Sequence, residues 1–368
     1  EINFKGMPRP RLPKRVAPDD CTVILYTSGT SGRPKGVMLT EQNLMTEVAA
    51  IDDAAKGLAI ETFLGVLPQF HSFGLTALTL WPLYRGNKII YSARFAPRKL
   101  HQLIRKHRPN VFFGVPAMFN AMLSLKKAEP ADFTSLQFSV AGGEPLPPSV
   151  SEKLMERFSL PVYEGYGLTE TAPVTNCNVP GKSKVGTVGK ALSGVRNVIV
   201  DDDGNPLGPN QDGEILIVGN NIMKGYHNLD QLTQEVITQV KLEGKNERAF
   251  KTGDIGHVDD EGFLAITGRK KEMLIVAGEN VFPREIEEVL DQHESVRASA
   301  VIGMSSETRG ELPLAFVELH EGHEFDEQAL KTFIRDRIAP FKVPKEIRHI
   351  DELPRNPTGK IMRRQLQV

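Results

Sequence analysis

The sequence predicts an α/β protein in which parallel sheets are covered by helices, followed by a β-rich subdomain and a small C-terminal α+β domain. Between residues 22 and 158, short apolar runs alternate with segments whose apolar residues recur at helical spacing. This alternation is typical of parallel strands joined by helices. After residue 180, short strands and Asp/Asn/Gly turns dominate. A separate strand and helix pattern begins after residue 272.

The elements of the first region can be assigned in chain order. Two apolar runs flank a glycine-rich loop and read as strand, loop, strand. The next segment has helical spacing with Thr40 as its cap, and then a buried strand and an apolar helix ending at Leu83 follow. The remaining strands are predicted at 88–91, 111–113 and 136–141, and the remaining helices at 97–107, after Pro116, and near 148–158. Parallel strands in this order place their carboxyl ends at one edge of the sheet.

The later elements divide the chain further. Strands at 195–200, 213–219 and 255–264 with intervening turns predict the β-rich subdomain. Beyond it, strands at 273–276, 298–302 and 314–319 and helices at 283–292 and 326–338 predict the small domain. The expected organisation is a lead at 1–20, an α/β part at 21–180, the β-rich part at 181–268, a hinge at 269–272 and a mobile domain at 273–368.

Composition excludes several classes of protein. The 368 residues are 40% hydrophobic and 25% charged with a net charge of −1, so no global field favours nucleic acid or an anionic membrane. Cys21 and Cys177 are far apart, which argues against a disulfide framework and agrees with a reducing cytoplasm. The most apolar run, 73–84, is too short for a membrane span, and residues 1–20 lack the apolar core of a secretory signal. Peripheral membrane contact stays open.

The loop at residues 26–37 reads Tyr-Thr-Ser-Gly-Thr-Ser-Gly-Arg-Pro-Lys-Gly-Val. Glycines let a backbone turn its N–H groups toward an anion, and hydroxyls and a lysine add donors and charge. The loop departs from the Walker P-loop, because Pro34 replaces its second glycine and Gly36 replaces the Ser or Thr that holds magnesium. A phosphate-binding loop is therefore predicted, with its metal ligand elsewhere. Its candidate contacts are Thr27, Ser28, Gly29, Thr30, Ser31, Gly32 and Lys35.

Further polar segments follow strand ends. Gly142-Gly143-Glu144 follows one strand, and Tyr166-Gly167-Leu168-Thr169-Glu170 follows another. Tyr166 could stack on a base, Thr169 could bond a phosphate oxygen, and Glu170 could hold Mg²⁺, which takes carboxylate and phosphate oxygens. Taken alone, the second segment also reads as a helix start with Thr169 as its cap. His71 lies between Phe70 and Phe73, and a packed histidine is an equal alternative to a functional one.

Four more segments are Phe250-Lys251-Thr252-Gly253-Asp254, Gly268-Arg269-Lys270-Lys271-Glu272, Ala277-Gly278-Glu279-Asn280-Val281 and Leu353-Pro354-Arg355-Asn356-Pro357-Thr358-Gly359-Lys360-Ile361. Together with the loop at 26–37 and the segment that contains Tyr166 and Glu170, they resemble six signatures of the adenylate-forming superfamily in the family's order. This superfamily includes acyl-CoA synthetases, nonribosomal peptide synthetase adenylation domains and luciferases. The resemblance covers the chain from about Thr22 to its end. It implies activation of a carboxylic acid by ATP and Mg²⁺ to an acyl-adenylate, then transfer to the thiol of CoA or of acyl carrier protein phosphopantetheine. The implied roles are adenine contact for Gly142, Gly143 and Glu144, ribose binding for Asp254, nucleotide contact for Arg269, hinge for Lys271, thiol tunnel for Gly278, catalysis for Lys360, and acyl pocket for Phe70 and His71.

Several alternatives stay open. Residues 7–13 and 70–76 resemble fatty acyl-CoA ligases and acyl-(acyl carrier protein) synthetases, which favours a medium- or long-chain fatty acid; an amino-acid or aryl-acid adenylation domain is the rival within the family. Family members carry a long portion before the phosphate loop, whereas this sequence begins almost at the loop. A catalytically inactive nucleotide-binding fragment, or a partner-dependent part of a larger enzyme, is therefore the alternative from another class, and we expect the chain alone to be less competent than a full-length relative.

Overall fold

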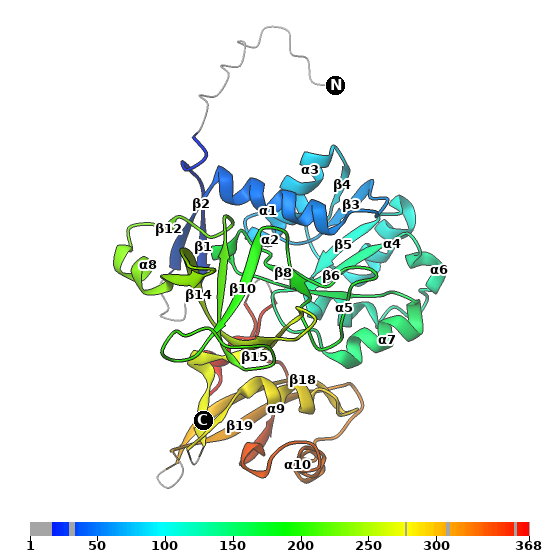
Figure 1. Cartoon of the computed structure of the whole chain (residues 1–368). Helices are drawn as coiled ribbons and strands as arrows, with labels where there is room; N and C mark the ends of the chain where they lie inside the picture. Colours follow the sequence, from blue (N-terminus) through cyan, green and yellow to red (C-terminus); the bar gives the residue numbers. More distant parts are fainter. Residues whose placement is uncertain (1–16, 29–33, 277, 307–309, 357–358, 368) are drawn as a thin grey trace.

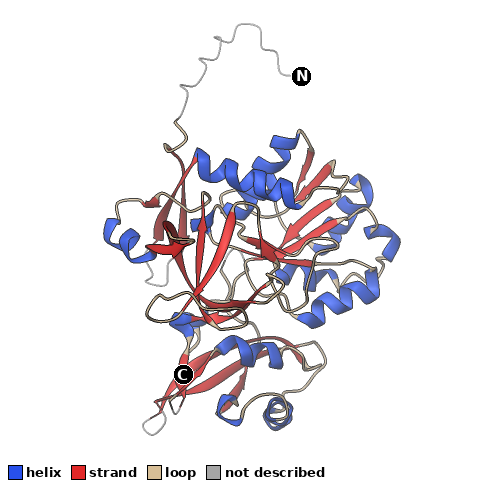
Figure 2. Cartoon of the chain, viewed as in Figure 1, coloured by secondary structure: helices blue, strands red, loops and turns tan. Residues whose placement is uncertain are grey.

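The computed structural model describes residues 17–28, 34–276, 278–306, 310–356 and 359–367 (Figure 1). A large body, drawn in blue to yellow, lies above a smaller body formed by the C-terminal part of the chain. Strands fill the interior of both bodies, and helices lie outside them (Figure 2). Among the described residues, no helix has the length and apolar character needed to cross a bilayer.

A seven-stranded sheet forms the centre of the large body, with the order β4-β3-β5-β6-β7-β8-β9. The pairs among its first five strands are all parallel, and the last two pairs are antiparallel. The predicted parallel sheet is therefore confirmed. Its strands are β3 (Thr62–Gly65), β4 (Lys88–Tyr91), β5 (Val111–Gly114), β6 (Phe138–Gly142), β7 (Tyr163–Tyr166), β8 (Asn176–Cys177) and β9 (Lys190–Ala191).

Helices cover both faces of this sheet, because successive strand residues point to opposite sides. Phe63 belongs to one buried cluster, where Trp81 lies edge-on to it at 4.9 Å between ring centroids, and Leu64 belongs to the other cluster. The first face carries α1 (Glu41–Ala54), α2 (Ser72–Leu75), a π-helical turn (Thr76–Leu80) and α3 (Trp81–Arg85). The second carries α4 (Pro97–His107), α5 (Pro116–Met122), α6 (Pro130–Phe133) and α7 (Pro148–Phe158).

Local signals explain where these helices begin. Thr40 caps α1, accepting from the Asn43 N–H while its own N–H donates to the Asn43 side chain. Each of α4 to α7 begins at a proline, which has no N–H to lose at that position. The bounds of α4 and α7 agree with the sequence expectation. The helix expected up to Leu83 is instead divided into α2, the π-helical turn and α3, with Pro82 in the first turn of α3.

Two antiparallel sheets complete the large body. The first joins β1 (Cys21–Ser28), β2 (Pro34–Thr40) and β12 (Gly225–Tyr226), so the strands that flank the phosphate loop form a hairpin. The second has the order β10-β11-β14-β13, and β15 pairs with β14. Its strands are β10 (Val195–Val200), β11 (Gly213–Gly219), β13 (Ile237–Leu242), β14 (Lys245–Val258) and β15 (Leu264–Arg269), with α8 (Asp230–Val236) preceding β13.

The small body has its own core. Its sheet has the order β17-β16-β19-β18, and β20 pairs in parallel with β19. Leu274, Ile286, Val301 and Leu330 are buried in one cluster that joins this sheet to two helices. The elements are β16 (Leu274–Val276), β17 (Glu279–Val281), α9 (Pro283–Leu290), β18 (Val296–Ser306), β19 (Gly310–Leu319), α10 (Glu327–Arg335) and β20 (Glu346–His349). Four elements were not predicted from the sequence: β12, α8, β13 and β20.

Candidate active site

The residues singled out in the sequence gather where strands of the large body end and the C-terminal loop of the small body meets them. Gly142 ends β6 and Tyr166 ends β7, so both lie at the carboxyl edge of the parallel sheet. Asp254 lies on β14 and Arg269 ends β15, and the two are directly opposite each other in the antiparallel register. This edge is where ligands of open parallel sheets bind.

Asp254 is the centre of a buried polar cluster. Its carboxylate accepts the Tyr166 hydroxyl at 2.6 Å on Oδ2 and pairs with Arg269 Nε at 2.8 Å on Oδ1. Only 2% of Asp254 is exposed. Burial, and then the Asp254 charge, raise the pKa of Tyr166 well above its usual range, so Tyr166 stays a neutral donor. Each carboxylate oxygen has a second lone pair, so the cluster retains acceptors for further hydroxyl groups.

Lys360 is presented by a tight loop of the small body. The Asn356 side chain accepts the Lys360 N–H at 2.9 Å, and the Lys360 carbonyl accepts the Asn356 N–H at 2.8 Å. The next residue, Ile361, donates its N–H to Glu144 Oε1 of the large body at 2.8 Å. The Lys360 loop is therefore held against the Gly142-Gly143-Glu144 segment.

Charges around Lys360 define the electrostatics of this junction. Burial lowers the pKa of Lys360, and the nearby Arg269 guanidinium lowers it further, while Glu144, Glu272 and Asp254 oppose the shift. Burial also lowers the pKa of His71, and the Lys360 charge contributes to that shift. His71 is thus neutral near physiological pH, with Nδ1 accepting the Phe73 N–H at 3.3 Å. A neutral histidine whose Nδ1 already accepts a backbone N–H is better suited to line a pocket than to act as a general acid or base.

The Thr169-Glu170 segment is tied to two other parts of the chain. Thr169 Oγ1 lies 3.2 Å from Ser72 Oγ, which begins the helix after the predicted acyl segment. Glu170 Oε1 accepts the Tyr226 hydroxyl at 2.8 Å, and Lys35 Nζ lies over the Tyr226 ring at 5.2 Å from its centroid. Strand β12 creates this arrangement by pairing Tyr226 with Val37. Tyr226 is a site residue that we did not predict, because a two-residue strand has no periodicity to detect.

Two glycines in the site have clear structural reasons. A side chain at Gly167 would bring its Cβ within 1.7 Å of the Pro173 carbonyl oxygen, so only glycine lets the segments meet here. Gly278 has φ of +90°, a backbone conformation that disfavours other residues, although open space surrounds the position. Gly278 is exposed in the turn between β16 and β17, whereas Lys360 lies in a different loop of the same body.

A short helix joins the two bodies. It spans Lys270–Glu272, between β15 and β16, and Lys271 is exposed within it. Lys270 is anchored to the β-rich sheet through Asp202 at 2.9 Å and Glu214 at 3.4 Å. Glu272 pairs with Arg363 of the C-terminal loop at 3.3 Å. The connection is therefore anchored on both sides of Lys271.

The remaining predicted residues are placed as follows. Thr27 and Ser28 end β1, whereas Gly29, Thr30, Ser31 and Gly32 lie outside the described residues. Phe70 is 75% exposed, on the surface beside the partly buried His71. The structure thus brings Glu144, Tyr166, Asp254, Arg269 and Lys360 together, with His71 beside Lys360. Gly278 lies apart from this group.

Glu47 forms a buried support for the site that the sequence analysis missed. It is fully buried on α1, accepting the Val174 N–H at 3.1 Å and the Asn221 amide at 3.3 Å. Asn221 also donates to the Thr171 carbonyl at 3.0 Å, and the Met223 N–H donates to the Glu170 carbonyl at 2.8 Å. The network therefore fixes the Thr169-Glu170 segment from behind. A Glu within an amphipathic helical pattern gave no sign of this role.

We expect Glu47 to make stability depend on pH. Burial raises the pKa of Glu47 well above its usual range, so the folded protein binds more protons than the unfolded chain at intermediate pH. The stability that neutral Glu47 contributes is fully present below the pKa that Glu47 has in the unfolded chain. It is lost as pH rises through the pKa that Glu47 has in the folded protein. In Glu47→Gln this dependence should disappear, so the variant should gain stability relative to the parent between about pH 5 and pH 8 in urea titrations. A constant difference across that range would contradict the assignment.

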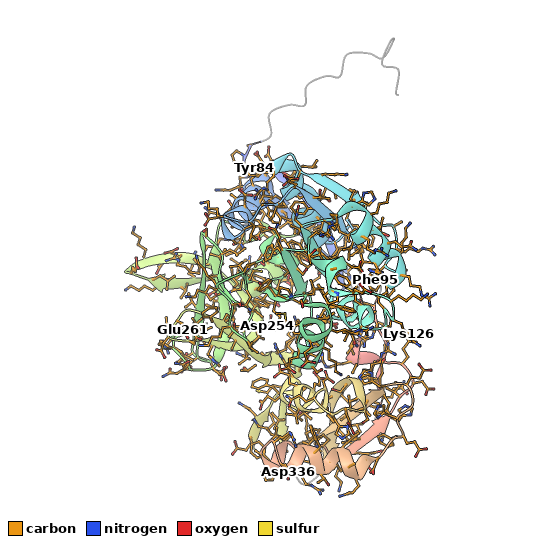
Figure 3. The ribbon with its side chains drawn as sticks, turned by 90° about the vertical axis from the view of Figure 1, so that its right-hand side faces the viewer. Tyr84, Phe95, Lys126, Asp254, Glu261 and Asp336 are labelled. Carbon is orange, nitrogen blue, oxygen red and sulfur yellow. The ribbon has the colours of Figure 1, made fainter. Side chains whose placement is uncertain are left out.

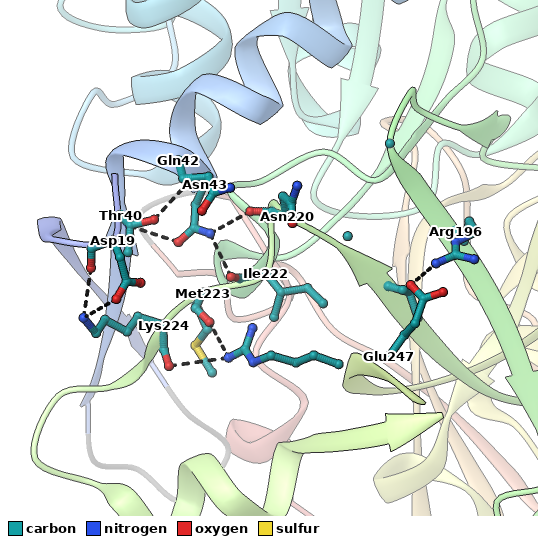
Figure 4. Close-up of a pocket in the computed structure, with 14 residues that line it drawn as sticks. Asp19, Thr40, Gln42, Asn43, Arg196, Asn220, Ile222, Met223, Lys224 and Glu247 are labelled. Atoms are coloured by element: carbon teal, nitrogen blue, oxygen red, sulfur yellow. Dashed lines mark hydrogen bonds and ion pairs between the residues drawn. The ribbon is translucent and has the colours of Figure 1, made fainter. Parts of the chain in front are cut away.

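A cavity of about 630 Å³ lies away from these residues (Figure 4). Its wall contains the Lys224–Asp19 and Arg196–Glu247 pairs, and Asn43 donates to the Asn220 and Ile222 carbonyls there. Its described lining contains none of the residues that the motifs predict. Asn43 matters to the site indirectly, because its bonds hold the segment that leads into β12 and Tyr226.

Comparison with known proteins agrees with this geometry. The AMP-binding enzyme model matches residues 2–227, and the model of the AMP-binding enzyme C-terminal domain matches residues 285–360. A long-chain-fatty-acid–CoA ligase of Bacillus subtilis is 37% identical over 96% of this chain and 63% of its own length. A 2-succinylbenzoate–CoA ligase of Geobacillus kaustophilus is 36% identical over 95% of this chain and 69% of its own.

A solved structure shows the same fold with ligands. The o-succinylbenzoate coenzyme A synthetase of Bacillus subtilis in complex with ATP and magnesium ion has a TM-score of 0.84 and 31% identity, over 95% of this chain and 70% of that one. The chain belongs to the AMP-binding enzyme family, the adenylate-forming superfamily that its signatures resemble. It spans 63% of the length of the Bacillus ligase.

Proposed function

We propose that this protein activates a carboxylic acid with ATP to give an acyl-adenylate and pyrophosphate, then transfers the acyl group to a thiol. The observation that carries the proposal is the convergence of Asp254, Arg269 and Glu144 of the large body with Lys360 of the small body. The names of the relatives, which are CoA ligases, favour CoA as the thiol, and acyl carrier protein phosphopantetheine is the alternative acceptor.

The proposed chemistry needs positive charge more than a general base. An ionised carboxylate is already a nucleophile, but its attack on the α-phosphate meets negative charge. Lys360 and Lys35 would offset this charge as fixed cations, and Thr169 would donate a hydrogen bond to a phosphate oxygen. Asp254 would accept the ribose hydroxyls, and Tyr166 and Gly167 would lie beside the nucleotide with Gly142 and Gly143.

Glu170 is the residue that would hold Mg²⁺. It suits the metal because Mg²⁺ usually takes one or two carboxylates together with phosphate oxygens rather than a complete protein cage. Among the described residues no cluster of three or more His, Cys, Asp or Glu suited to a metal is found, which agrees with a site completed by phosphate. Bound there, the ion would neutralise charge on the phosphates. The Tyr226 hydroxyl at 2.8 Å fixes one Glu170 oxygen in place.

We further propose that the acid is aliphatic and of medium or long chain. Support comes from the fatty-acid specificity in the name of the Bacillus ligase and from the apolar segments around His71, where Phe73 stacks on Phe113 at 5.7 Å between ring centroids. The aryl-acid name of the Geobacillus ligase keeps an aryl acid as the rival substrate.

A series of straight-chain acids tests the substrate proposal. Each additional CH₂ that is buried should contribute about 0.8 kcal/mol, which is roughly fourfold in kcat/KM, until the pocket is full. Activity should therefore rise steadily from acetate upward, measured as pyrophosphate release at fixed ATP. A preference for acetate, benzoate or an amino acid would refute an aliphatic pocket.

ATP–pyrophosphate exchange tests the reaction itself. An acid-dependent exchange by this chain would support adenylate formation, and adding CoA or carrier protein would then identify the acceptor. The competing function is a nucleotide-binding protein without catalysis, or one active only with a partner. That function predicts ATP binding by calorimetry with no exchange for any acid in the panel.

A further inference from the structure

Arg355 lies shortly before Lys360 in the C-terminal loop, and the proposed chemistry gives it no role. Its Nη1 donates a hydrogen bond to the Gly359 carbonyl at 3.2 Å. Because Gly359 directly precedes Lys360, this bond fixes the backbone at the point where the Lys360 side chain departs. Arg355 also forms an antiparallel bridge with Ile361, the residue that follows Lys360. Arg355 therefore contacts the chain on both sides of the proposed catalytic lysine.

A buried carboxylate ties Arg355 to the core of the small body. Glu318 lies on β19, and only 1% of it is exposed. Its Oε1 accepts the Leu353 N–H at 2.5 Å, and its Oε2 lies 3.7 Å from Arg355 Nη2. Within the described residues Oε2 accepts no hydrogen bond, so nearby cations must offset its buried charge. The start of the Lys360 loop and the Arg355 side chain are thus both held by one residue of the small sheet.

The segment that Arg355 holds is also the segment that reaches the large body. The Ile361 N–H donates to Glu144 Oε1 at 2.8 Å. A side chain at Gly359 would place its Cβ 3.4 Å from Val115, which immediately precedes α5. Burial raises the pKa of Glu144, and the Arg355 charge opposes that shift, so Arg355 lies close to the carboxylate that receives the loop.

The ammonium group of Lys360 depends on its backbone for its position. Lysine carries a compact charge on a flexible four-carbon chain, and in the described part of the protein no ion pair holds Lys360 Nζ. The Asp254 charge influences the pKa of Lys360 across the junction. Figure 3 shows Asp254 in the part of the large body nearest the small body, and Asp336 on the far side of the small body. A shift of the Lys360 backbone would therefore move the charge relative to the nucleotide-binding residues.

We propose that Arg355 is a positioning residue for adenylate formation. It links Glu318, which is fixed in the small sheet, to the carbonyl before Lys360, and so sets where the Lys360 charge meets the large body. The inference rests on the proposed function, because Lys360 is the cation that Arg355 would position. Arg355 acts through Lys360 and does not itself touch the reacting groups.

Hydrogen exchange tests this positioning without turnover. In Arg355→Gln, the amide protons of residues 353–363 should exchange about tenfold faster than in the parent, as expected for the loss of one hydrogen bond from a charged donor. Arg297→Gln is the matched control, because Arg297 Nε lies 3.8 Å from the same Glu318 oxygen. Among the described residues, no hydrogen bond joins Arg297 to this loop, so exchange should stay unchanged. Equal exchange in the parent and Arg355→Gln, or an equal increase in both variants, would overturn the proposal.

Adenylation kinetics test whether Arg355 acts through Lys360. Arg355→Gln should lower the single-turnover rate of adenylate formation by about tenfold to a hundredfold, the loss that a small misplacement of a catalytic group causes. The KM for ATP should change little, because Asp254 is untouched, and thiol transfer from a preformed adenylate should continue. Arg355→Lys keeps the charge and a donor, so it should recover part of the rate.

A double variant separates a positioning role from a general structural one. Adding Arg355→Gln to Lys360→Ala should slow adenylation no further, because residues that act through one another are not additive. A further loss in the double variant, or an Arg355→Gln rate equal to that of Arg297→Gln, would refute the role. If the parent adenylates no acid, the proposed function fails, and hydrogen exchange still decides whether Arg355 orders the loop.

Discussion

Replacing Lys360 by alanine should slow adenylate formation by a factor on the order of 10²–10³, as expected for one lost electrostatic contact in the transition state. The same variant should still convert a preformed acyl-adenylate into the thioester. The physical reason is the position of Lys360 in a loop held against Glu144 through Ile361, near Asp254 and Arg269. Single-turnover assays of the two half-reactions measure the two effects separately.

The pH dependence of adenylation gives a second readout of Lys360. Burial and Arg269 lower the pKa of Lys360, so its positive charge is lost at lower pH than that of an ordinary lysine. The adenylation rate should therefore decline on the alkaline side earlier than an exposed lysine would allow. Lys360→Arg should remove this decline, because arginine keeps its charge. Lys345→Ala, an exposed lysine of the same body, is the matched control and should leave both readouts unchanged.

Replacing Gly278 should impair the other half-reaction, the transfer of the acyl group to the thiol. We propose that the small body rotates about Lys271 so that Lys360 serves adenylation and the Gly278 loop serves thiol transfer, a hinge-type change. Gly278→Leu should then form adenylate and stall at transfer, because a leucine side chain would block the thiol tunnel that we propose for this loop. The φ of +90° would also strain any side chain there. Lys271→Pro should lose one half-reaction by fixing φ. Loss of the same half-reaction in Lys360→Ala and Gly278→Leu would eliminate the two-orientation mechanism.

Removing the charge of Asp254 should weaken ATP binding by roughly a hundredfold, the loss expected for a hydrogen-bonded pair of hydroxyls on a buried carboxylate. The structure shows why Asp254→Asn is a better test than Asp254→Ala. The carboxylate also holds Tyr166 and Arg269, so alanine would leave both donors without their partner. Asparagine keeps the shape of the side chain and one acceptor oxygen.

Calorimetry of ATP binding decides the role of Asp254. Asp212→Asn is the matched control, because Asp212 is an exposed carboxylate of the same β-rich region that contacts His257 at 2.8 Å. It should bind ATP like the parent protein. Unchanged nucleotide affinity in a folded Asp254→Asn variant would show that the carboxylate is purely structural.

The fold class and many of the elements were accessible from local sequence pattern. Helices that begin at proline, such as α4 and α7, and a capped helix such as α1 carry their own start signals. Strands β3, β5 and β6 in the middle of the parallel sheet are buried on both faces, so each is a continuous apolar run that is easily recognised in the sequence. Elements without such signals were missed, among them the two-residue β12 and the parallel β20.

Motif spacing also identified the site residues by their chemical type, but it did not identify their hydrogen-bond partners. Thr169, Glu170, Asp254 and Lys360 were each marked by a glycine-rich or proline-rich loop that presents a polar side chain. Their partners lie far away in sequence: Tyr226 is 56 positions from Glu170, and Asp254 is 88 positions from Tyr166. No local pattern encodes such a pairing, because a hydrogen bond between distant residues depends on how the sheets pack.

The sequence by itself determined the α/β class, the family and the types of side chain available for phosphate, ribose and metal binding. Only the tertiary structure decided which of them meet. It placed the Lys360 loop against the large body, brought Tyr166 and Arg269 to the Asp254 carboxylate, and buried Glu47 behind the Thr169-Glu170 segment. The reason is physical: residue type and local spacing set what each segment can do, whereas burial and the distances between charges arise only when segments from the whole chain pack together.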